Sequence, residues 1–422
     1  MSVVENFNKT YKSDIRYAIN TCRNIALFLG LWPNNNNVKK SLLKKSLKLI
    51  INFTSILLMT FVIISCILFG TFELKLMSQR IILTGPTSFY VMAFMKYSII
   101  LFRSDDLENC LKIIENDWQY INYKQRQIML KHAKFGRIIT IFCAIFMYLG
   151  GFWFHVISPL TAEPIVTEKN ISIQPFPSPV YGKFLTSGQS PIYEIIYIAE
   201  LIVGFIMYSI AITTFSFAAI LTIHACSQFE IVILNLDNLF SGIEKYSDLH
   251  DKLIVTVNSH LKVLSFVSQL ESVFNEICFI EIMGCTLNIC LLGYYTIMGW
   301  KKQELSAILT YSILLASFIF NIFIYCLIGE MVTIQVSKFN FLFFFTSIIF
   351  FLQATKVGEK SYMINWYLMP KKTSKDLLFF IRISQYPSKI SAGKIFVLSL
   401  GTFCTVLKTS AAYFNALWKM SQ

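Results

Sequence analysis

The segment Ser391-Ala-Gly-Lys394 resembles the end of a phosphate-binding loop, in which backbone N–H groups and a lysine hold the phosphates of a nucleotide. The first glycine of such a loop and the Ser or Thr that follows its lysine are missing. The sequence has no GxSxG, HExxH or GxGxxG motif, and its five histidines do not have metal-ligand spacing. We therefore predict that the protein is not an enzyme and uses neither a metal ion nor a cofactor.

A second set of polar residues lies on one face of the last apolar segment, at steps of three or four residues. Lys394 and Lys408 occur in the same segment, and a charged side chain inside a membrane span usually faces water or extends to the interface. The face either lines a water-filled pore or packs small and hydroxyl residues against a neighbouring helix. It consists of Leu398, Thr402, Thr405, Thr409, Ala412, Ala416 and Met420.

Membrane-spanning helices must position these residues, because the composition differs from that of a soluble domain. Hydrophobic residues make up 55% of the 422 residues and charged residues 14%, with a mean hydropathy of +0.58, whereas a soluble domain carries about 25% charged residues. We predict an all-α polytopic membrane protein with seven transmembrane helices. The predicted spans are Leu47–Gly70, Ile81–Phe102, Gly136–Ile157, Ile192–Ile223, Ser272–Met298, Leu305–Met331 and Ala392–Leu417.

The distribution of basic residues predicts the orientation of these spans. Lysine and arginine are dense in the N-terminal segment, with seven more in 102–137 and eight in 336–390. Only two occur in each of 71–80, 158–191 and 299–304. Basic loops remain on the cytoplasmic side, so we predict a cytoplasmic N-terminus and an extracellular C-terminus. In this setting the net charge of +13 indicates cytoplasmic loops and not binding of nucleic acid.

Two long connectors, Arg103–Phe135 and His224–Glu271, are predicted to be helical and cytoplasmic. The first has Ser104 as a candidate N-cap, followed by two acidic residues that favour a helix start. Its apolar residues then follow one helix face. They are Leu107, Leu111, Ile114, Trp118 and Ile121.

The connector Ser158–Pro191 differs from these two. It holds six of the ten prolines and shows no apolar periodicity, so we predict an irregular external loop. Asn170 starts an Asn-Ile-Ser sequon in this loop and is a candidate glycosylation site, in agreement with an external position.

Three groups of residues near the C-terminus, together with the layout of spans, resemble an insect odorant receptor. They are Gly329-Glu330 after the sixth span, Gly358-Glu359 with Tyr362 and Trp366-Tyr367, and Ser391-Ala-Gly-Lys394 with Ser399-Leu400, Lys408-Thr-Ser410 and Tyr413-Phe414. The chain resembles a ligand-tuning subunit and not the shared co-receptor, whose cytoplasmic loop is longer.

This resemblance implies an odorant-gated, non-selective cation channel that detects volatile hydrophobic molecules in the dendrite membrane of a sensory neuron. A tuning subunit forms a heterotetramer with the co-receptor in the plasma membrane, and the last helix of each subunit lines the pore. The implied division is a cytoplasmic segment 1–46, spans and ligand pocket in 47–331, a cytoplasmic anchor 332–390 and the pore helix region 391–422. The alternatives are a gustatory receptor channel of the same fold and, from another class, a secondary transporter, although the internal repeats of a transporter are not evident.

The resemblance also places a ligand pocket in the outer half of the membrane, among spans two, three, four and six. Aromatic walls with a few hydroxyl groups suit small apolar ligands, although such residues also occur in ordinary cores and interfacial belts. The pair Gly150-Gly151 allows a close helix approach nearby. The candidates are Phe89, Tyr90, Ala93, Tyr148, Phe152, Trp153, Tyr193, Tyr197 and Tyr311.

The apolar block Val336–Gln353 interrupts the predicted anchor. Its run Phe341–Leu352 has only twelve residues, too few to cross a membrane. In the family that the chain resembles, the sixth span continues almost directly into the Gly-Glu…Trp-Tyr motif. The block begins with Val-Ser, as a splice donor read in frame would, and is rich in residues that a pyrimidine tract encodes. We interpret it as translated intron, with a genuine lineage-specific insertion as the alternative.

Overall fold

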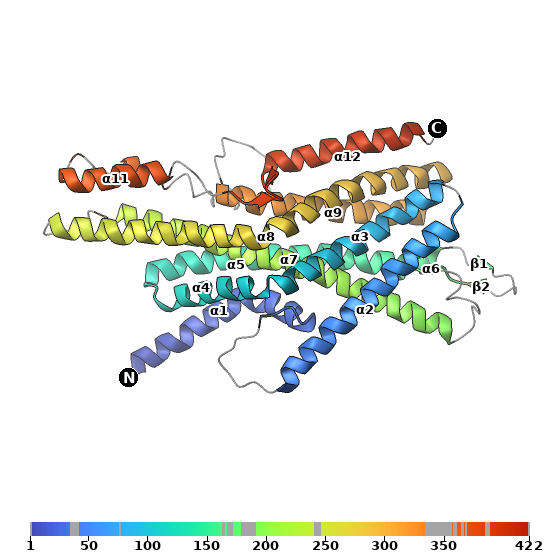
Figure 1. Cartoon of the computed structure of the whole chain (residues 1–422), viewed down its shortest axis with the longest axis horizontal. Coiled ribbons are helices and arrows are strands. Elements are labelled where there is room, and N and C mark those ends of the chain that lie inside the picture. Colours follow the sequence, from blue (N-terminus) through green and yellow to red (C-terminus); the bar gives the residue numbers. More distant parts are fainter. Residues whose placement is uncertain are drawn as a thin grey trace.

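Long helices account for most of the described chain; several run along its long axis and others cross it obliquely (Figure 1). The computed structural model describes residues 2–33, 42–75, 77–162, 165–166, 172–178, 191–239, 246–333, 357, 361–363, 367, 369–384 and 389–420. The helices are α1 (Ser2–Phe28), α2 (Leu42–Phe72), α3 (Met77–Phe102), α4 (Ser104–Gln119), α5 (Tyr123–Phe152), the π-helical turn η1 (Trp153–Ile157), α6 (Ser158–Thr161), α7 (Ile192–Asp237), α8 (Tyr246–Lys302), α9 (Leu305–Thr333), α11 (Lys371–Ser384) and α12 (Leu400–Met420).

Five helices are long and apolar enough to cross a membrane, namely α2, α5, α7, α8 and α9. They contain five of the seven predicted spans. The predicted second and seventh spans lie in α3 and α12, which are not among the five in the described chain. Charged residues lower the apolarity of both, including Lys96 in α3 and Lys408 in α12. The chain is mostly helical, as predicted, while the count of seven spans and the sides on which the termini lie stay predictions.

Two helices extend far beyond the spans predicted for them. α7 has 46 residues and α8 has 57, so at about 1.5 Å per residue each is more than twice as long as the ~30 Å hydrocarbon core. Their extensions meet α4 and α5 at one end of the bundle, which we call the α4 end (left in Figure 1). The opposite end carries α6 and is called the α6 end. The predicted connector His224–Glu271 therefore consists largely of continuations of α7 and α8, whereas Arg103–Phe135 forms α4 and the start of α5.

Helix α4 shows which local predictions succeed. Leu107, Ile114 and Trp118 are buried, which confirms the predicted apolar face. The predicted N-cap is wrong, because Ser104 is already the first helical residue and Arg103 precedes it without a side-chain cap. A capping box that the sequence analysis missed starts α5, where Asn122 Oδ1 accepts from the backbone N–H of Gln125 at 2.9 Å.

The predicted irregular loop Ser158–Pro191 contains regular elements. It begins with α6 and includes the antiparallel strands β1 (Ile165–Val166) and β2 (Ser172–Ile173). The prediction of an entirely irregular loop was therefore wrong. The sequon residue Asn170 lies outside the described residues, as does the block Val336–Gln353 after the end of α9.

The C-terminal helix starts eight residues later than the predicted span. Residues from Ser391 form a hairpin of β3 (Ser391–Ala392) and β4 (Phe396–Val397), and Gly393 in its turn has a φ of 63°. The backbone N–H of Gly393 donates to the carbonyl of Asn275 in α8 at 3.0 Å. The segment that resembles a phosphate-binding loop is therefore a turn packed on α8, and not the start of a span.

Most of the cysteines pack in the core of the bundle. All ten are free, and nine of them are buried in the helix bundle. This agrees with the apolar runs in which most of them occur.

Candidate functional site

A cavity of about 360 Å³ lies near the α6 end, between α2, α3, α5, α7, α8 and α9. Its volume is within the range of small-molecule sites, at the lower end. Aromatic and aliphatic side chains form most of its surface. It is lined by Phe69, Leu74, Gln79, Leu83, Gly85, Pro86, Phe89, Tyr90, Met147, Gly150, Phe154, Pro177, Tyr208, Asn288, Leu292, Tyr295, Tyr311, Leu314, Ser317 and Phe318.

Two small residues let helices approach closely around this cavity. A Cβ atom on Gly151 of α5 would lie 2.4 Å from Cε2 of Tyr208, so only glycine leaves room for the tyrosine ring. Gly150 lines the cavity itself. The predicted close approach at this glycine pair is confirmed. The π-helical turn that follows α5 then directs Phe154 to the cavity wall.

Aromatic contacts fix the cavity wall. The ring of Phe89 lies 5.3 Å from that of Tyr208 and 5.7 Å from that of Phe318, between centroids. On the other side the rings of Tyr295 and Tyr311 are 5.3 Å apart. Such tilted and edge-on contacts between neighbouring helices hold the rings in place. Rigid aromatic surface of this kind binds a small apolar molecule with little loss of side-chain freedom.

Several polar groups at the cavity already have partners. The hydroxyl of Tyr90 shares a hydrogen bond with Ser178, and the Ser178 N–H donates to the carboxylate of Glu200 at 3.2 Å. The hydroxyl of Tyr295 donates to the carbonyl of Ile81, in the turn of α3 that precedes Pro86.

Two lining tyrosines have hydroxyl groups without a partner. The hydroxyls of Tyr208 and Tyr311 make no hydrogen bond to any described residue, although both rings are packed. A bound molecule with an oxygen atom could accept a hydrogen bond from either hydroxyl. The site thus combines a large apolar surface with these two free tyrosine hydroxyls.

The structure brings three of the nine predicted residues to this cavity, namely Phe89, Tyr90 and Tyr311. Ala93 is buried one turn further along α3, and Phe152 points out of the bundle with 55% of its surface exposed.

The remaining four predicted residues make hydrogen bonds elsewhere. Tyr148 pairs with Ser209 at 2.8 Å, and Trp153 Nε1 donates to Thr310 at 3.0 Å. The hydroxyls of Tyr193 and Tyr197 donate to the carbonyls of Gln174 and His155 at 3.2 and 3.1 Å. These residues shape the surroundings of the cavity without lining it.

Sequence reasoning missed the contribution of α8 and the middle of α7. Asn288, Leu292 and Tyr295 line the cavity from α8, and Tyr208 lines it from α7. The glycine pair before Trp153 was a usable signal for Tyr208, because the missing side chain leaves room for a ring from the facing helix.

The candidate pore face of α12 is arranged as follows. Thr405, Ala412 and Ala416 are exposed, while Thr402 and Thr409 are half-buried. The opposite side of the helix packs on the bundle, where the Ser410 hydroxyl donates to the carbonyl of Thr286 at 3.0 Å. This face of α12 therefore points away from the rest of the chain.

The two ends of the candidate pore set differ from its middle. Leu398 precedes α12 and is buried against Gly329 of α9, so it does not share the helix face with the other residues. Met420 is the last residue of α12.

Comparisons with known proteins give the family. A model of the family described as 7tm Odorant receptor matches residues 77–411. Odorant receptor 10 of Aedes albopictus is 25% identical over 249 residues, which cover 56% of this chain and 59% of that protein. Odorant receptor 45a of Drosophila melanogaster is 24% identical over 314 residues, with 73% and 71% covered. The chain thus spans just over half the length of the first of these relatives.

A solved structure shares the fold. The insect olfactory receptor OR5 from Machilis hrabei, determined in complex with eugenol, superposes with a TM-score of 0.75 at 15% identity and covers 96% of this chain and all of that one. At this identity the likeness concerns the fold alone. The match of the family model over most of the chain goes further: the chain belongs to the seven-transmembrane odorant receptor family.

Proposed function

We propose that the protein is the ligand-tuning subunit of an odorant-gated, non-selective cation channel, in a heterotetramer with the family's co-receptor. The observation that carries the proposal is the cavity of about 360 Å³ with its aromatic wall. The Machilis receptor was solved with eugenol, a small aromatic molecule with oxygen substituents. A volatile of similar size suits the cavity of this chain, with Phe89, Tyr208 and Phe318 on one side and Tyr311 on another.

The proposed placement puts the α6 end outside the cell and the α4 end in the cytoplasm of a sensory dendrite. The basic residues of 102–137 belong to the α4 end, which supports this orientation. In this placement the cavity opens in the outer half of the membrane. Residues Thr402, Thr405, Thr409, Ala412 and Ala416 of α12 then face the central axis, together with the same helix of the other subunits.

Expression of three combinations tests the proposal. The chain alone, the co-receptor alone and the pair are compared in cells exposed to a panel of volatiles, with surface labelling of each subunit. We expect an odorant-evoked cation current in the pair that neither subunit gives alone. An odorant-evoked current from this chain alone would favour a channel of the gustatory type. No evoked current from a pair that reaches the surface would overturn the proposal.

The block Val336–Gln353 has its own test. We propose that it is translated intron, since a twelve-residue apolar run is too short for a span and would be an aggregation liability in a cytoplasmic anchor. Transcripts from olfactory tissue are then expected to lack the matching stretch, and the chain without these eighteen residues should reach the cell surface in larger amounts. Predominant transcripts that contain the stretch, with normal channel function, would show that it is a genuine insertion.

A further inference from the structure

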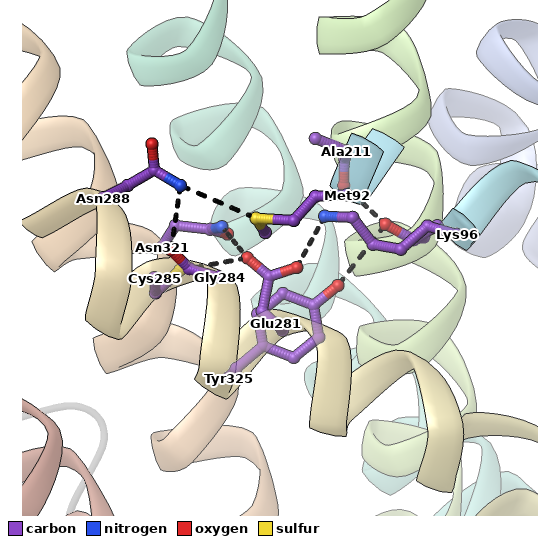
Figure 2. Close-up of polar contacts among 10 residues, drawn as sticks. Met92, Lys96, Ala211, Glu281, Gly284, Cys285, Asn288, Asn321 and Tyr325 are labelled. Atoms are coloured by element: carbon purple, nitrogen blue, oxygen red, sulfur yellow. Dashed lines mark hydrogen bonds and ion pairs between the residues drawn. The ribbon is translucent and has the colours of Figure 1, made fainter. Parts of the chain in front are cut away.

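A buried ion pair lies in the middle of the helix bundle (Figure 2). Lys96 Nζ of α3 is 2.6 Å from Oε2 of Glu281 in α8, and the two side chains are 2% and 1% exposed. The other carboxylate oxygen accepts hydrogen bonds from Asn321 of α9 and, at 3.3 Å, from the thiol of Cys285. Tyr325 lies beside the carboxylate (Figure 2). One carboxylate thus joins three helices, in a part of the bundle where a charge without a partner is very costly.

This pair lies close to the cavity, on the side that Asn288 lines. Asn288 lines the cavity two turns along α8 from Glu281, and its Nδ2 is 3.8 Å from the sulfur of Met92. Met92 precedes Lys96 by one turn of α3, and its side chain fills the space that Gly284 leaves open, since a Cβ there would lie 1.9 Å from the sulfur. Side-chain packing is therefore continuous from Asn288 in the cavity lining, through Met92, to the ion pair.

Helix α9 provides a second connection. Asn321, which donates to Glu281, follows the cavity residues Ser317 and Phe318 by one turn of the helix. If a ligand displaces Phe318 and this turn of α9 moves with it, the Asn321 amide shifts relative to the Glu281 carboxylate.

The two helices that meet at Glu281 and Asn321 also hold α12. The Ser410 hydroxyl of α12 donates to the Thr286 carbonyl of α8, and the rings of Phe323 in α9 and Phe403 in α12 are 5.3 Å apart. At the start of α12, the N–H of Leu400 donates to the carboxylate of Glu330 in α9 at 3.1 Å. Along α9, Asn321 thus lies between the cavity residues Ser317 and Phe318 and the two contacts with α12 made by Phe323 and Glu330.

We propose that the Lys96–Glu281 pair, with Asn321, couples occupancy of the cavity to the position of α12. The inference rests on the proposed channel function. The three residues are positioning residues, because none of them lines the cavity or the outward face of α12. Parting α3 from α8 would separate two buried charges, so the pair favours the arrangement in which these helices are in contact, and we assign that arrangement to the closed channel. An odorant acts against this preference only through contacts that differ between the two arrangements.

A purely structural role makes a different prediction. Replacing a buried ion pair by apolar side chains of similar size is often neutral or stabilising, whereas removing one partner leaves a buried charge unpaired. If the pair served folding alone, the double replacement would restore both the amount of protein and its response. If the pair sets the coupling, the double replacement would restore the amount of protein, but its odorant response would still differ from that of wild type.

The double variant Lys96→Met/Glu281→Met, expressed with the co-receptor, separates these roles. We expect surface expression close to wild type, a current without odorant at least twice that of wild type, and an odorant EC50 at least threefold lower. The matched control is Arg126→Met/Asp14→Met, which removes the 2.6 Å ion pair between α5 and α1, far from the cavity. Its EC50 is expected to remain within twofold of wild type.

Each result decides one of the two claims. A wild-type pair of subunits without evoked current overturns the channel function and this inference with it. Evoked current from wild type, with a double variant whose EC50 is unchanged or raised, overturns the coupling alone. If the double variant does not reach the surface, Asn321→Ala decides, since it removes one hydrogen bond and keeps the ion pair. That variant is expected to lower the EC50 at least twofold, and an unchanged EC50 overturns the coupling.

Discussion

Two hollows lie toward opposite ends of the described bundle, and the wall of one is far more polar than that of the other. The cavity near the α6 end is lined mainly by aromatic and aliphatic side chains. A larger hollow of about 950 Å³ lies at the α4 end between α4, α5, α7 and α8, and we call it the polar crevice. Its lining includes Asp117, Gln228, Asn235, Asp251 and Lys262.

The difference shows that size does not identify the ligand site. Amide and charged groups line the polar crevice, and a small apolar molecule offers them no hydrogen bond, so it gains little by entering. In the smaller cavity, the same molecule exchanges water contact for aromatic surface. The smaller hollow is therefore the better site for a hydrophobic volatile, even though the crevice has more than twice its volume.

The two hollows also differ in what holds their walls together. Ring contacts hold the cavity, whereas the crevice depends on Asp117, which pairs with Lys262 and, at 3.0 Å, with Nε2 of His224. Burial alone would raise the pKa of Asp117, but these two hydrogen bonds outweigh it and lower the pKa below its usual value. The stability of the crevice wall should therefore depend on pH, whereas the shape of the cavity should depend on the volume of its side chains.

The largest expected effect comes from filling the cavity. Leu314 of α9 lines it, so Leu314→Trp places an indole in the space that a ligand would occupy. We expect the odorant EC50 of the pair with the co-receptor to rise at least tenfold. The matched control is Leu309→Trp, five residues earlier on the same helix, where the leucine is 42% exposed and outside the cavity lining. Equal losses in both variants, at equal surface expression, would remove the cavity from ligand binding.

Removing a single free donor should give a smaller and more selective change. Tyr208→Phe keeps the ring between Phe89 and Gly151 and deletes only the hydroxyl. One hydrogen bond contributes about 1 kcal/mol, or roughly fivefold in affinity. We expect sensitivity to ketones, esters or phenols to fall by roughly that factor, and sensitivity to hydrocarbons of equal length to persist. A uniform change for both classes of odorant would show that the hydroxyl donates to no ligand.

Residues of the cavity show how far the sequence could predict this site. Phe89, Tyr90 and Tyr311 were found because they are aromatic residues in the outer halves of predicted spans. Tyr295 and Asn288 were missed because the angle at which α8 enters the bundle depends on packing among helices distant in sequence. The sequence predicts a helix directly after Gly393. The positive φ of Gly393 instead allows a tight turn, and the chain forms the β3–β4 hairpin there. Helical structure followed from composition and the buried face of α4 from its periodicity, whereas the inward faces of the apolar helices α7 and α8 needed the assembled bundle.

The outward face of α12 belongs to neither hollow, and its substitution should change conduction without changing odorant affinity. Thr405 is exposed on this face, and its hydroxyl bonds only to the Gly401 carbonyl at 3.0 Å within its own helix. We expect Thr405→Leu to alter the unitary conductance or the permeability ratios of the channel by a modest factor, since other subunits share the pore. Single-channel recording measures both quantities. Unchanged conduction would mean that the face packs against protein or lipid.

In the polar crevice, Asp117→Asn should affect stability and not odorant sensitivity. The carboxylate in α4 has a lowered pKa, so its stabilising contribution is complete above the ordinary value near 3.8 and is lost as pH falls through the lower folded value. Lys262 is 60% exposed, which reduces its share, and we expect a loss of about 1 kcal/mol at neutral pH. Thermal unfolding of the solubilised protein should show a lower Tm at pH 7 and a difference that shrinks toward pH 3. A difference independent of pH would mean that the carboxylate charge contributes nothing.

The smallest functional effect is expected at Asn170, which tests which hollow lies on the outer side. If the α6 end is extracellular, the sequon of Asn170 enters the secretory lumen during synthesis and receives a glycan. Asn170→Gln should then increase electrophoretic mobility to that of enzymatically deglycosylated wild type, with odorant sensitivity unchanged. The sequon at Asn8 in the N-terminal segment is the matched control, since a cytoplasmic site receives no glycan and Asn8→Gln should leave mobility as it is. A glycan on Asn8 instead would reverse the orientation, bring the polar crevice to the outer side and place the aromatic cavity in the inner half of the membrane.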